Sequence, residues 1–433
     1  MIFIWKFVQT FRSLMKKLNY LFLLFILTIA SCSKKDKAPV VAPEPNKPQV
    51  NEIQKKAPYV ILISLDGYRY DYTKKYRPLN IQTFIKGGVE AEGIIPVYPS
   101  LTFPNHYSLV TGMKSENHGI VQNKFYDPKR DETYHFMKAT GKDGSWYTGE
   151  PLWKTAMKQG LKTASFFWVG SDAKGNHPDF WRRYDGRVAK DKRVDQVLDW
   201  LKLPLGERPN FITLYFSEVD SRGHKYGPDS PEVARAVMNV DSAIGRLMDG
   251  LEEVNLPVNV IIVSDHGMQQ LYKDKVVYLD DYLKDTTGVR IVGGGAHTNL
   301  YIPNKETRNK VYKILKNVDH ISVYKKEEVP EHFGYKNNIR IGDLTVSTHA
   351  PYYLIKSRAS GREPKGATHG FEPLKTPSMN GIFYAKGPNF KSGLKIKAVE
   401  NIHVYPMILE ILGLKLNHKI DGKAEVLRPI LVD

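Results

Sequence analysis

Cysteine is almost absent from this sequence, and its scarcity excludes one class of fold. The chain of 433 residues contains a single cysteine, Cys32, so no intramolecular disulfide can form. A small scaffold held together by disulfides is therefore excluded. The length instead allows one large α/β domain or two ordinary ones, and a hydrophobic content of 42% supports a sizeable buried core.

Long hydrophobic runs are also lacking. The apolar residues 21–29 are too few for a confident membrane span, and they follow the basic pair Lys16-Lys17. They end in Ile29-Ala30-Ser31-Cys32, which resembles a bacterial lipobox. We therefore predict a lipoprotein signal peptide over residues 1–31, with Met15 as an alternative start. The predicted product is an exported cell-envelope lipoprotein, held on a bacterial membrane by a lipidated Cys32, with its main domain periplasmic or surface-exposed. An ordinary free thiol after a signal peptide is the alternative.

Acidic residues are fewer than basic residues in this sequence. Lysine and arginine number 63 against 46 acidic residues, which gives a formal net charge of +17. Four of the basic residues and no acidic residue lie in residues 1–31, so the remainder keeps +13. The lysines are scattered and form no nucleic-acid-binding motif, whereas a basic surface favours anionic ligands or membrane headgroups. Residues 32–56 are rich in proline and polar residues, and we predict an extended, disordered tether there.

Apolar runs alternate with helical patterns in the rest of the chain. Residues 59–65, 211–216 and 258–263 are continuous apolar runs, typical of strands buried on both faces of a parallel sheet. The helical patterns between them predict a doubly wound α/β sheet with helices on both faces. We assign residues 57–433 to one catalytic domain. Its less regular stretch, about 271–365, forms a smaller inserted cap region with a flexible loop at the glycines 293–295.

Thr102 lies where a strand-like run gives way to a predicted helix over residues 105–111. Pro104 suits the first helical turn, and the free N–H groups of a helix start favour a bound anion. A hydroxyl at such a point can attack phosphorus if it is held as an alkoxide. Taken alone, Thr102 is better explained as a helix N-cap, and only the rest of the chain favours a catalytic role.

Carboxylates and imidazoles follow several predicted strands, in short segments that each contain a glycine. They are Asp66, Asp220, His224, Asp265, His266 and His369. Because ligands bind at the carboxyl edge of open α/β sheets, we expect these side chains to gather there. Three carboxylates, three imidazoles and a hydroxyl suit two divalent ions, and mixed nitrogen and oxygen ligands favour zinc. We assign the remaining histidines of this part of the chain to packing or surface positions, with the reservation that His106 lies close to Thr102; they include His106, His118, His135, His297 and His403.

The order of these motifs resembles the type I phosphodiesterase/nucleotide pyrophosphatase family of the alkaline phosphatase superfamily. The resemblance covers roughly residues 58–415. The motifs that carry it are Leu65-Asp66-Gly67, Pro99-Ser100-Leu101-Thr102-Phe103-Pro104-Asn105-His106, Val219-Asp220-Ser221-Arg222-Gly223-His224, Ser264-Asp265-His266-Gly267-Met268 and Thr368-His369-Gly370.

The resemblance implies an alkaline-phosphatase-like fold and two zinc ions. One ion would be bound by Asp66, Thr102, Asp265 and His266, and the other by Asp220, His224 and His369. Asn123 would steady a non-bridging phosphoryl oxygen, while Phe103 and Tyr184 would stack on the nucleoside. The segment Trp168-Val169-Gly170-Ser171 departs from the family's Trp-Pro-Gly-Ser at Val169, which bears on the shape of that loop and on substrate preference.

The implied reaction is hydrolysis of phosphodiester or pyrophosphate bonds in nucleotides and their derivatives. It would pass through a phosphothreonine at Thr102 and release a nucleoside monophosphate. Three alternatives stay open: a phosphomonoesterase of the alkaline phosphatase type, a choline-lipid phosphodiesterase, and an inactive surface-tethered binding module. A sulfatase is disfavoured because Thr102 is neither cysteine nor serine.

Overall fold

The computed structural model describes residues 52–432. The predicted signal peptide, Cys32 and the tether as far as residue 51 lie outside the described residues. The last five residues of the predicted tether are helical: they form α2 (Glu52–Lys56), and the side-chain amide of Gln54 donates to the carbonyl of Leu205 at 2.8 Å. Within residues 52–432, no helix combines the length and the apolar character needed to cross a bilayer.

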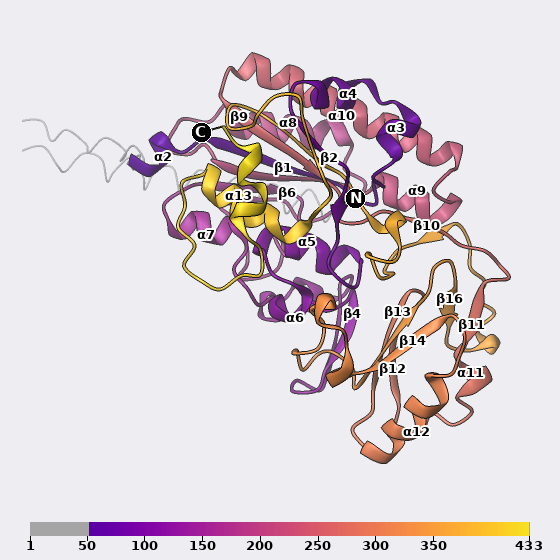
Figure 1. Ribbon diagram of the computed structural model, residues 1–433. Helices are drawn as coiled ribbons and strands as arrows, with labels where there is room; N and C mark the ends of the chain where they lie inside the picture. Colours follow the sequence, from indigo (N-terminus) through magenta and orange to yellow (C-terminus); the bar gives the residue numbers. More distant parts are fainter. Residues whose placement is uncertain (1–51, 433) are drawn as a thin grey trace, which may run out of the picture. The chain divides into compact units, whose positions relative to one another are not determined.

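A mixed sheet of eight strands runs through the centre of the described unit (Figure 1). Its middle strand, β1 (Tyr59–Leu65), pairs in parallel with β8 (Phe211–Phe216) on one side and with β9 (Val258–Val263) on the other. The strand order is β19–β2–β18–β9–β1–β8–β6–β7, and β18 runs antiparallel to both of its neighbours. The outer strands are β2 (Val89–Ala91), β6 (Thr163–Phe166), β7 (Phe180–Trp181), β18 (Phe383–Lys386) and β19 (Leu394–Ile396).

Helices cover both faces of this sheet, because side chains along β1 point alternately to two separate cores. Val60 and Leu62 face one core, whereas Ile61 and Ile63 face the other. The first core is covered by α5 (Thr102–Thr111), α7 (Leu152–Lys158) and α13 (Val404–Ile411), and the second by α4 (Leu79–Lys86), α8 (Lys190–Leu201) and α10 (Pro231–Val254). The predicted doubly wound α/β sheet is confirmed.

The inserted segment has a sheet and a core of its own. Its antiparallel strands follow the order β12–β13–β15–β14, and Leu300, Leu315 and Val346 belong to its core. The segment is thus more regular than its sequence pattern indicates. Gly293 and Gly294 end a strand and pair with the next one, where the sequence predicts a flexible loop. The elements are β12 (Arg290–Gly294), β13 (His297–Tyr301), α12 (Lys305–Leu315), β14 (Ile321–Lys325) and β15 (Leu344–Thr348).

A buried arginine ties the insert to the main sheet unit. The guanidinium of Arg340 lies 2.9 Å from the carboxylate of Asp127 and donates to the carbonyls of Gly119 and Trp146. Asp127 closes a small hairpin, β4 (Lys124–Asp127) with β5 (Glu132–His135), that lies beside β12. The remaining short elements are α3 (Tyr72–Tyr76), β3 (Ile94–Ile95), α6 (Ser115–His118), α9 (Glu218–Tyr226), β10 (Gln269–Gln270), β11 (Val276–Tyr278), α11 (Leu279–Tyr282), β16 (Tyr353–Ile355), β17 (Ala367–Thr368), β20 (Val399–Glu400) and α14 (Ala424–Leu427).

Candidate active site

Three parallel strands deliver acidic residues to the same edge of the sheet. Asp66 follows β1 directly, and Asp265 and His266 follow β9 after one residue. After β8 the chain enters α9, which carries Asp220 and His224 one turn apart on the same face. The spacing of four residues, seen in the sequence, is therefore the spacing of a helix. Asp220 lies in the first turn of α9, where the helix dipole favours a negative charge.

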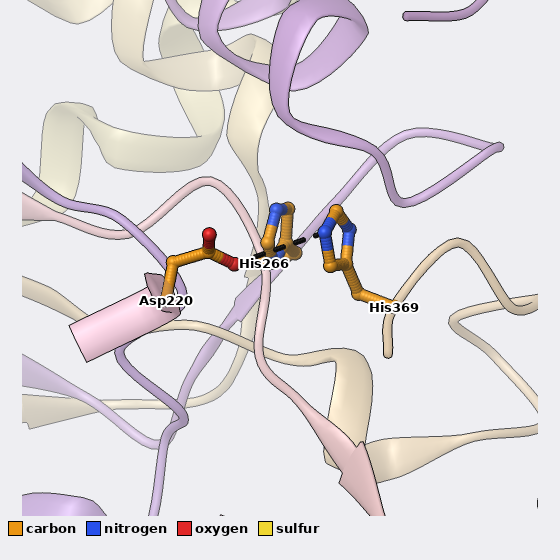
Figure 2. Close-up of side chains that lie close together, drawn as sticks. All are labelled: Asp220, His266 and His369. Carbon is orange, nitrogen blue, oxygen red and sulfur yellow. Dashed lines mark ion pairs between the residues drawn. The ribbon is translucent and has the colours of Figure 1, made fainter. Parts of the chain in front are cut away.

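His369 reaches this edge by a different route. It follows β17, which pairs antiparallel with β10, and β10 comes just after Gly267 and Met268. This pairing brings the rings of His266 and His369 face to face, with centroids 3.5 Å apart and an interplanar angle of 13° (Figure 2). The Asp220 carboxylate points toward the same pair, with Oδ1 3.8 Å from His369 Nε2 (Figure 2).

Thr102 is the first residue of α5, so the helix begins three residues earlier than predicted. The N-cap position belongs to Leu101, and no side chain makes a capping hydrogen bond there. The interpretation of Thr102 as an ordinary N-cap is therefore wrong. Its hydroxyl lies 3.2 Å from Nε2 of His266 instead.

The predicted metal ligands form two adjoining groups that share His266. In the first group, His266 Nε2 lies 2.9 Å from Asp265 Oδ2 and 3.6 Å from Asp66 Oδ1. The second group joins His266 to Asp220 and His369, and all ligand atoms within a group lie within 4.8 Å of one another. His224 adjoins the second group, because its Nε2 lies 3.3 Å from Asp220 Oδ1 and 3.1 Å from His369 Nε2.

The orientation of these side chains fits cation binding. The Nδ1 atoms of His224, His266 and His369 each lie 2.9 Å from a backbone carbonyl, to which they must donate. In each neutral ring Nε2 then carries a lone pair that faces the shared space. Metal-binding imidazoles are usually oriented in this way, by a hydrogen bond from their other ring nitrogen. One carboxylate oxygen of each aspartate in the two groups is buried without a hydrogen bond: Asp66 Oδ1, Asp220 Oδ1 and Asp265 Oδ2. Buried oxygens of this kind are costly unless a cation satisfies them.

Crowding perturbs the acid–base behaviour of the cluster. Burial, and then the neighbouring charges of Asp265 and Asp220, raise the pKa of Asp66 well above its usual value. Burial opposes the charged form of His224, but the Asp220 carboxylate more than offsets this and raises its pKa to about 9. Burial and the adjacent imidazoles lower the pKa of His369 to about 3. Strong perturbations gathered at one sheet edge are typical of a functional site.

The predicted substrate-binding residues lie around this cluster. The side-chain oxygen of Asn123 accepts the N–H of Phe103 at 3.0 Å, so Asn123 adjoins the residue after Thr102. The Phe103 ring packs edge-on against Phe136, with centroids 5.0 Å apart. Tyr184 is 45% exposed, and its ring contacts that of Tyr215, whose hydroxyl donates to Asp66 Oδ2 at 2.5 Å.

His106 lies at this site, although the sequence assigns it to packing or surface, with the reservation that it is close to the Thr102 motif. It is fully buried one turn after Thr102 on α5, and its Nδ1 lies 3.2 Å from Asp265 Oδ2. The assignment to packing or surface did not anticipate this contact with a predicted ligand. The spacing of four residues from Thr102 would have been a signal, but the predicted helix began only at residue 105 and so left Thr102 out.

Comparisons with known proteins agree on a family. The family model described as type I phosphodiesterase / nucleotide pyrophosphatase matches residues 60–372. Human ectonucleotide pyrophosphatase/phosphodiesterase family member 1 is 38% identical over 373 residues, which are 83% of this chain and 40% of the relative. A venom phosphodiesterase of Crotalus durissus collilineatus is 35% identical over 369 residues, 82% of this chain and 44% of its own. The chain therefore spans less than half the length of these curated relatives.

Similar solved structures come from the same family of proteins. Murine ectonucleotide pyrophosphatase / phosphodiesterase 5 matches with a TM-score of 0.82 and 29% identity, over 86% of this chain and all of that chain. An inactive variant of the murine protein, in which a threonine is replaced by alanine, is in complex with AMP. It matches with the same TM-score and identity over 87% of this chain and all of that chain. These matches confirm the alkaline-phosphatase-like fold predicted from the sequence.

Proposed function

This chain belongs to the type I phosphodiesterase / nucleotide pyrophosphatase family, and we propose that it hydrolyses phosphodiester or pyrophosphate bonds in nucleotides and their derivatives. The observation that carries the proposal is the position of the Thr102 hydroxyl, at the start of α5 and 3.2 Å from His266 Nε2. The murine relative supports it, because that protein is inactive as a threonine-to-alanine variant and binds AMP.

Zinc is the cation that this set of nitrogen and oxygen ligands favours. We infer that two ions are held. Each, when bound, would lower the pKa of a nearby hydroxyl and offset the negative charge that builds on phosphoryl oxygens. The ligands of one ion would be Asp66, Thr102, Asp265 and His266, and those of the other Asp220, His224 and His369.

The chain's own groups account for the rest of the reaction. Thr102 Oγ1 forms a bond to phosphorus while the bond to the leaving oxygen breaks, and the hydroxyl proton is taken up by the leaving group in the net reaction. Water then adds to phosphorus, the Thr102 oxygen departs and regains a proton, and a nucleoside monophosphate is released. The side-chain nitrogen of Asn123 donates to a non-bridging phosphoryl oxygen, because the oxygen of that amide is already used by Phe103 N–H.

Charge and aromatic side chains near the site favour a nucleotide over a choline lipid. Phe103 and Tyr184 offer ring faces for a base. Lys124, Lys356 and Arg362 are exposed, and burial and then the charges of Lys124 and Arg362 lower the pKa of Lys356. Within residues 52–432 none of these three cations pairs with a carboxylate. Such a group of cations, in which Lys124 follows Asn123 in the chain, attracts a phosphate-bearing leaving group and repels a choline ammonium.

We further propose that lipidation of Cys32 anchors the protein to a bacterial membrane. The support is the sequence Ile29-Ala30-Ser31-Cys32 after a short apolar segment, which lies outside the described residues. Replacing Cys32 by serine should move the protein from the membrane fraction to the soluble fraction. Continued membrane association of C32S would contradict the anchor.

The nucleophile is tested with two variants of Thr102. We expect Thr102→Ala to abolish turnover of thymidine 5′-monophosphate p-nitrophenyl ester while zinc content stays largely intact. Thr102→Ser keeps a hydroxyl on Cβ, so it should retain measurable turnover and form a phosphoserine that can be trapped by acid quenching. Normal activity of T102A would refute the assignment.

The same assay separates the rival activities. We expect the nucleoside ester to be hydrolysed faster than either p-nitrophenyl phosphate or p-nitrophenyl phosphorylcholine. A preference for p-nitrophenyl phosphate would indicate a phosphomonoesterase, and a preference for the choline ester would indicate a lipid phosphodiesterase. Zinc binding without turnover of any of the three would favour the inactive binding module.

A further inference from the structure

The buried imidazole of His106 touches three elements that meet at the site. Its Nδ1 lies 2.9 Å from the carbonyl oxygen of Thr102 and 3.2 Å from Asp265 Oδ2. Its Nε2 lies 2.8 Å from the hydroxyl of Ser64, on β1. The rings of Trp168 and Tyr215 each contact it edge-on, with centroids 5.2 Å away. The ring is therefore held on all sides, and its polar contacts are specific.

These contacts fix the tautomer of the ring. A carbonyl oxygen and a carboxylate oxygen can only accept hydrogen bonds, so Nδ1 must carry the hydrogen. In the neutral ring Nε2 is then an acceptor, and the Ser64 hydroxyl donates to it. The Nδ1–H group donates to the carbonyl of Thr102, and the carboxylate of Asp265, predicted to bind metal, lies 3.2 Å from the same nitrogen.

We propose that His106 is a positioning residue that sets the separation between Thr102 and Asp265. It does not touch the reacting atoms; it acts through its two neighbours. This inference rests on the proposed function, because the separation matters only if Thr102 attacks phosphorus beside an ion held by Asp265.

The geometry of Asp265 shows why such a contact matters. One carboxylate oxygen, Oδ1, accepts the backbone N–H of Gly67 at 3.2 Å. The other, Oδ2, faces Nε2 of His266 at 2.9 Å and Nδ1 of His106. His106 packs against Oδ2 and so limits how far the carboxylate can turn, although Oδ2 itself accepts no hydrogen bond and is free for a cation. Loss of a partner of this kind commonly costs 10- to 100-fold in metal affinity or activity.

Two substitutions of similar size separate positioning from simple packing. Asparagine at position 106 places its amide nitrogen near the position of Nδ1, whereas glutamine reaches the position of Nε2. We expect His106→Asn to keep zinc affinity and kcat within several-fold of the wild type. We expect His106→Gln to lose about 10- to 100-fold in kcat with little change in KM, and to bind zinc more weakly in competition with a chelator.

A purely structural role predicts a different result. Both variants would then lose activity alike, in proportion to the drop in their unfolding temperatures, and that outcome would overturn the proposal. The zinc competition measurement does not depend on turnover. The wild type could hydrolyse no diester while the His106→Asn variant still binds zinc more tightly than the His106→Gln variant. In that case the proposed function fails and the positioning role stands.

Ser64→Ala provides a second route if the His106 variants fail to fold. It leaves the imidazole in place but removes the donor to Nε2, so the ring loses one of the polar contacts that hold its orientation. We expect a several-fold loss of zinc affinity and of kcat, with an unfolding temperature close to that of the wild type. Unchanged zinc affinity and unchanged kcat in S64A would refute the positioning role.

Discussion

At the scale of single residues, Asn123 has two amide atoms with two different tasks. The oxygen accepts the backbone N–H of Phe103 at 3.0 Å, which fixes which end of the amide is which. The nitrogen is then the end that can donate to a phosphoryl oxygen. A small polar side chain in a loop has no periodicity, so its role followed only from the family resemblance and not from the residue itself.

Two substitutions at Asn123 separate these tasks. Asn123→Ala removes both atoms, and we expect kcat to fall by about 10²- to 10³-fold, as when one donor to a transition-state oxyanion is lost. Asn123→Asp keeps an acceptor for Phe103 N–H but places a negative charge where the donor stood. We therefore expect N123D to be as inactive as N123A, with an unfolding temperature closer to the wild type. Steady-state kinetics and thermal unfolding measure both effects, and a fully active N123D would contradict the donor role.

At the scale of elements, the turn after β1 is shaped by what lies against it. Gly67 has φ +66° and contacts the start of α9 so closely that a Cβ there would lie 2.8 Å from the Cα and Cβ atoms of Asp220. The backbone N–H of Asp220 also donates to the carbonyl of Asp66 at 3.0 Å. The pair Asp66-Gly67 therefore positions two predicted ligands at once, its own carboxylate and that of Asp220.

Substituting alanine for Gly67 tests this packing. The left-handed backbone conformation costs an alanine roughly 1–2 kcal/mol wherever it occurs. Gly288 offers a matched control, because it has φ +73° and a methyl group added there would meet no atom within 4 Å. We expect G67A and G288A to share this loss of stability, whereas only G67A also displaces Asp220 and loses at least about tenfold in zinc affinity and kcat/KM. Equal activity of the two variants would show that the turn tolerates the shift.

The strands at this edge could be predicted well because their sequences are simple. A continuous, short apolar run such as residues 258–263 is typical of a buried strand, and the polar residue that follows it must lie at the sheet edge. The first turn of α5 was harder, because Thr102 and Phe103 precede a proline that also suits a helix starting later. The helix α9 was missed as a helix because its nine residues contain Gly223 and few apolar side chains.

At the scale of the whole molecule, the sequence predicted that His369 joins the other ligands, but not the strand pairing that brings it there. His369 comes to His266 only because β17 pairs with β10, and each of these strands has two residues and no apolar pattern. Nothing in the sequence distinguishes Arg340 from the other basic residues, yet it is buried against Asp127 and two backbone carbonyls. Pairings between distant segments depend on the folded geometry of both partners, and neither partner carries a local signal for it.

Buried neutral histidines make the stability of the whole molecule sensitive to acid. His118 is buried on α6, its Nδ1 accepts the N–H of Ile120 at 3.2 Å, and its Nε2 lies 3.0 Å from the Ser108 hydroxyl. Burial lowers the pKa of His118 from 6.5 to about 3. Between these two values the unfolded chain binds a proton at this site and the folded chain does not. Stability contributed by neutral His118 is therefore present above pH 6.5 and is lost as the pH falls toward 3.

His118→Gln isolates this contribution, because glutamine keeps a donor toward Ser108 and cannot take up a proton. We expect the free energy of unfolding of the zinc-loaded wild type to fall more steeply between pH 6.5 and 4.5 than that of H118Q, by about 1.4 kcal/mol per pH unit. Urea unfolding at several pH values measures the difference in slope. The predicted metal ligands and His297, whose pKa burial also lowers to about 3, are common to both proteins and cancel in the comparison. Equal slopes of unfolding free energy against pH in the two proteins would contradict this prediction. They would mean that folded His118 binds a proton as readily as it does in the unfolded chain.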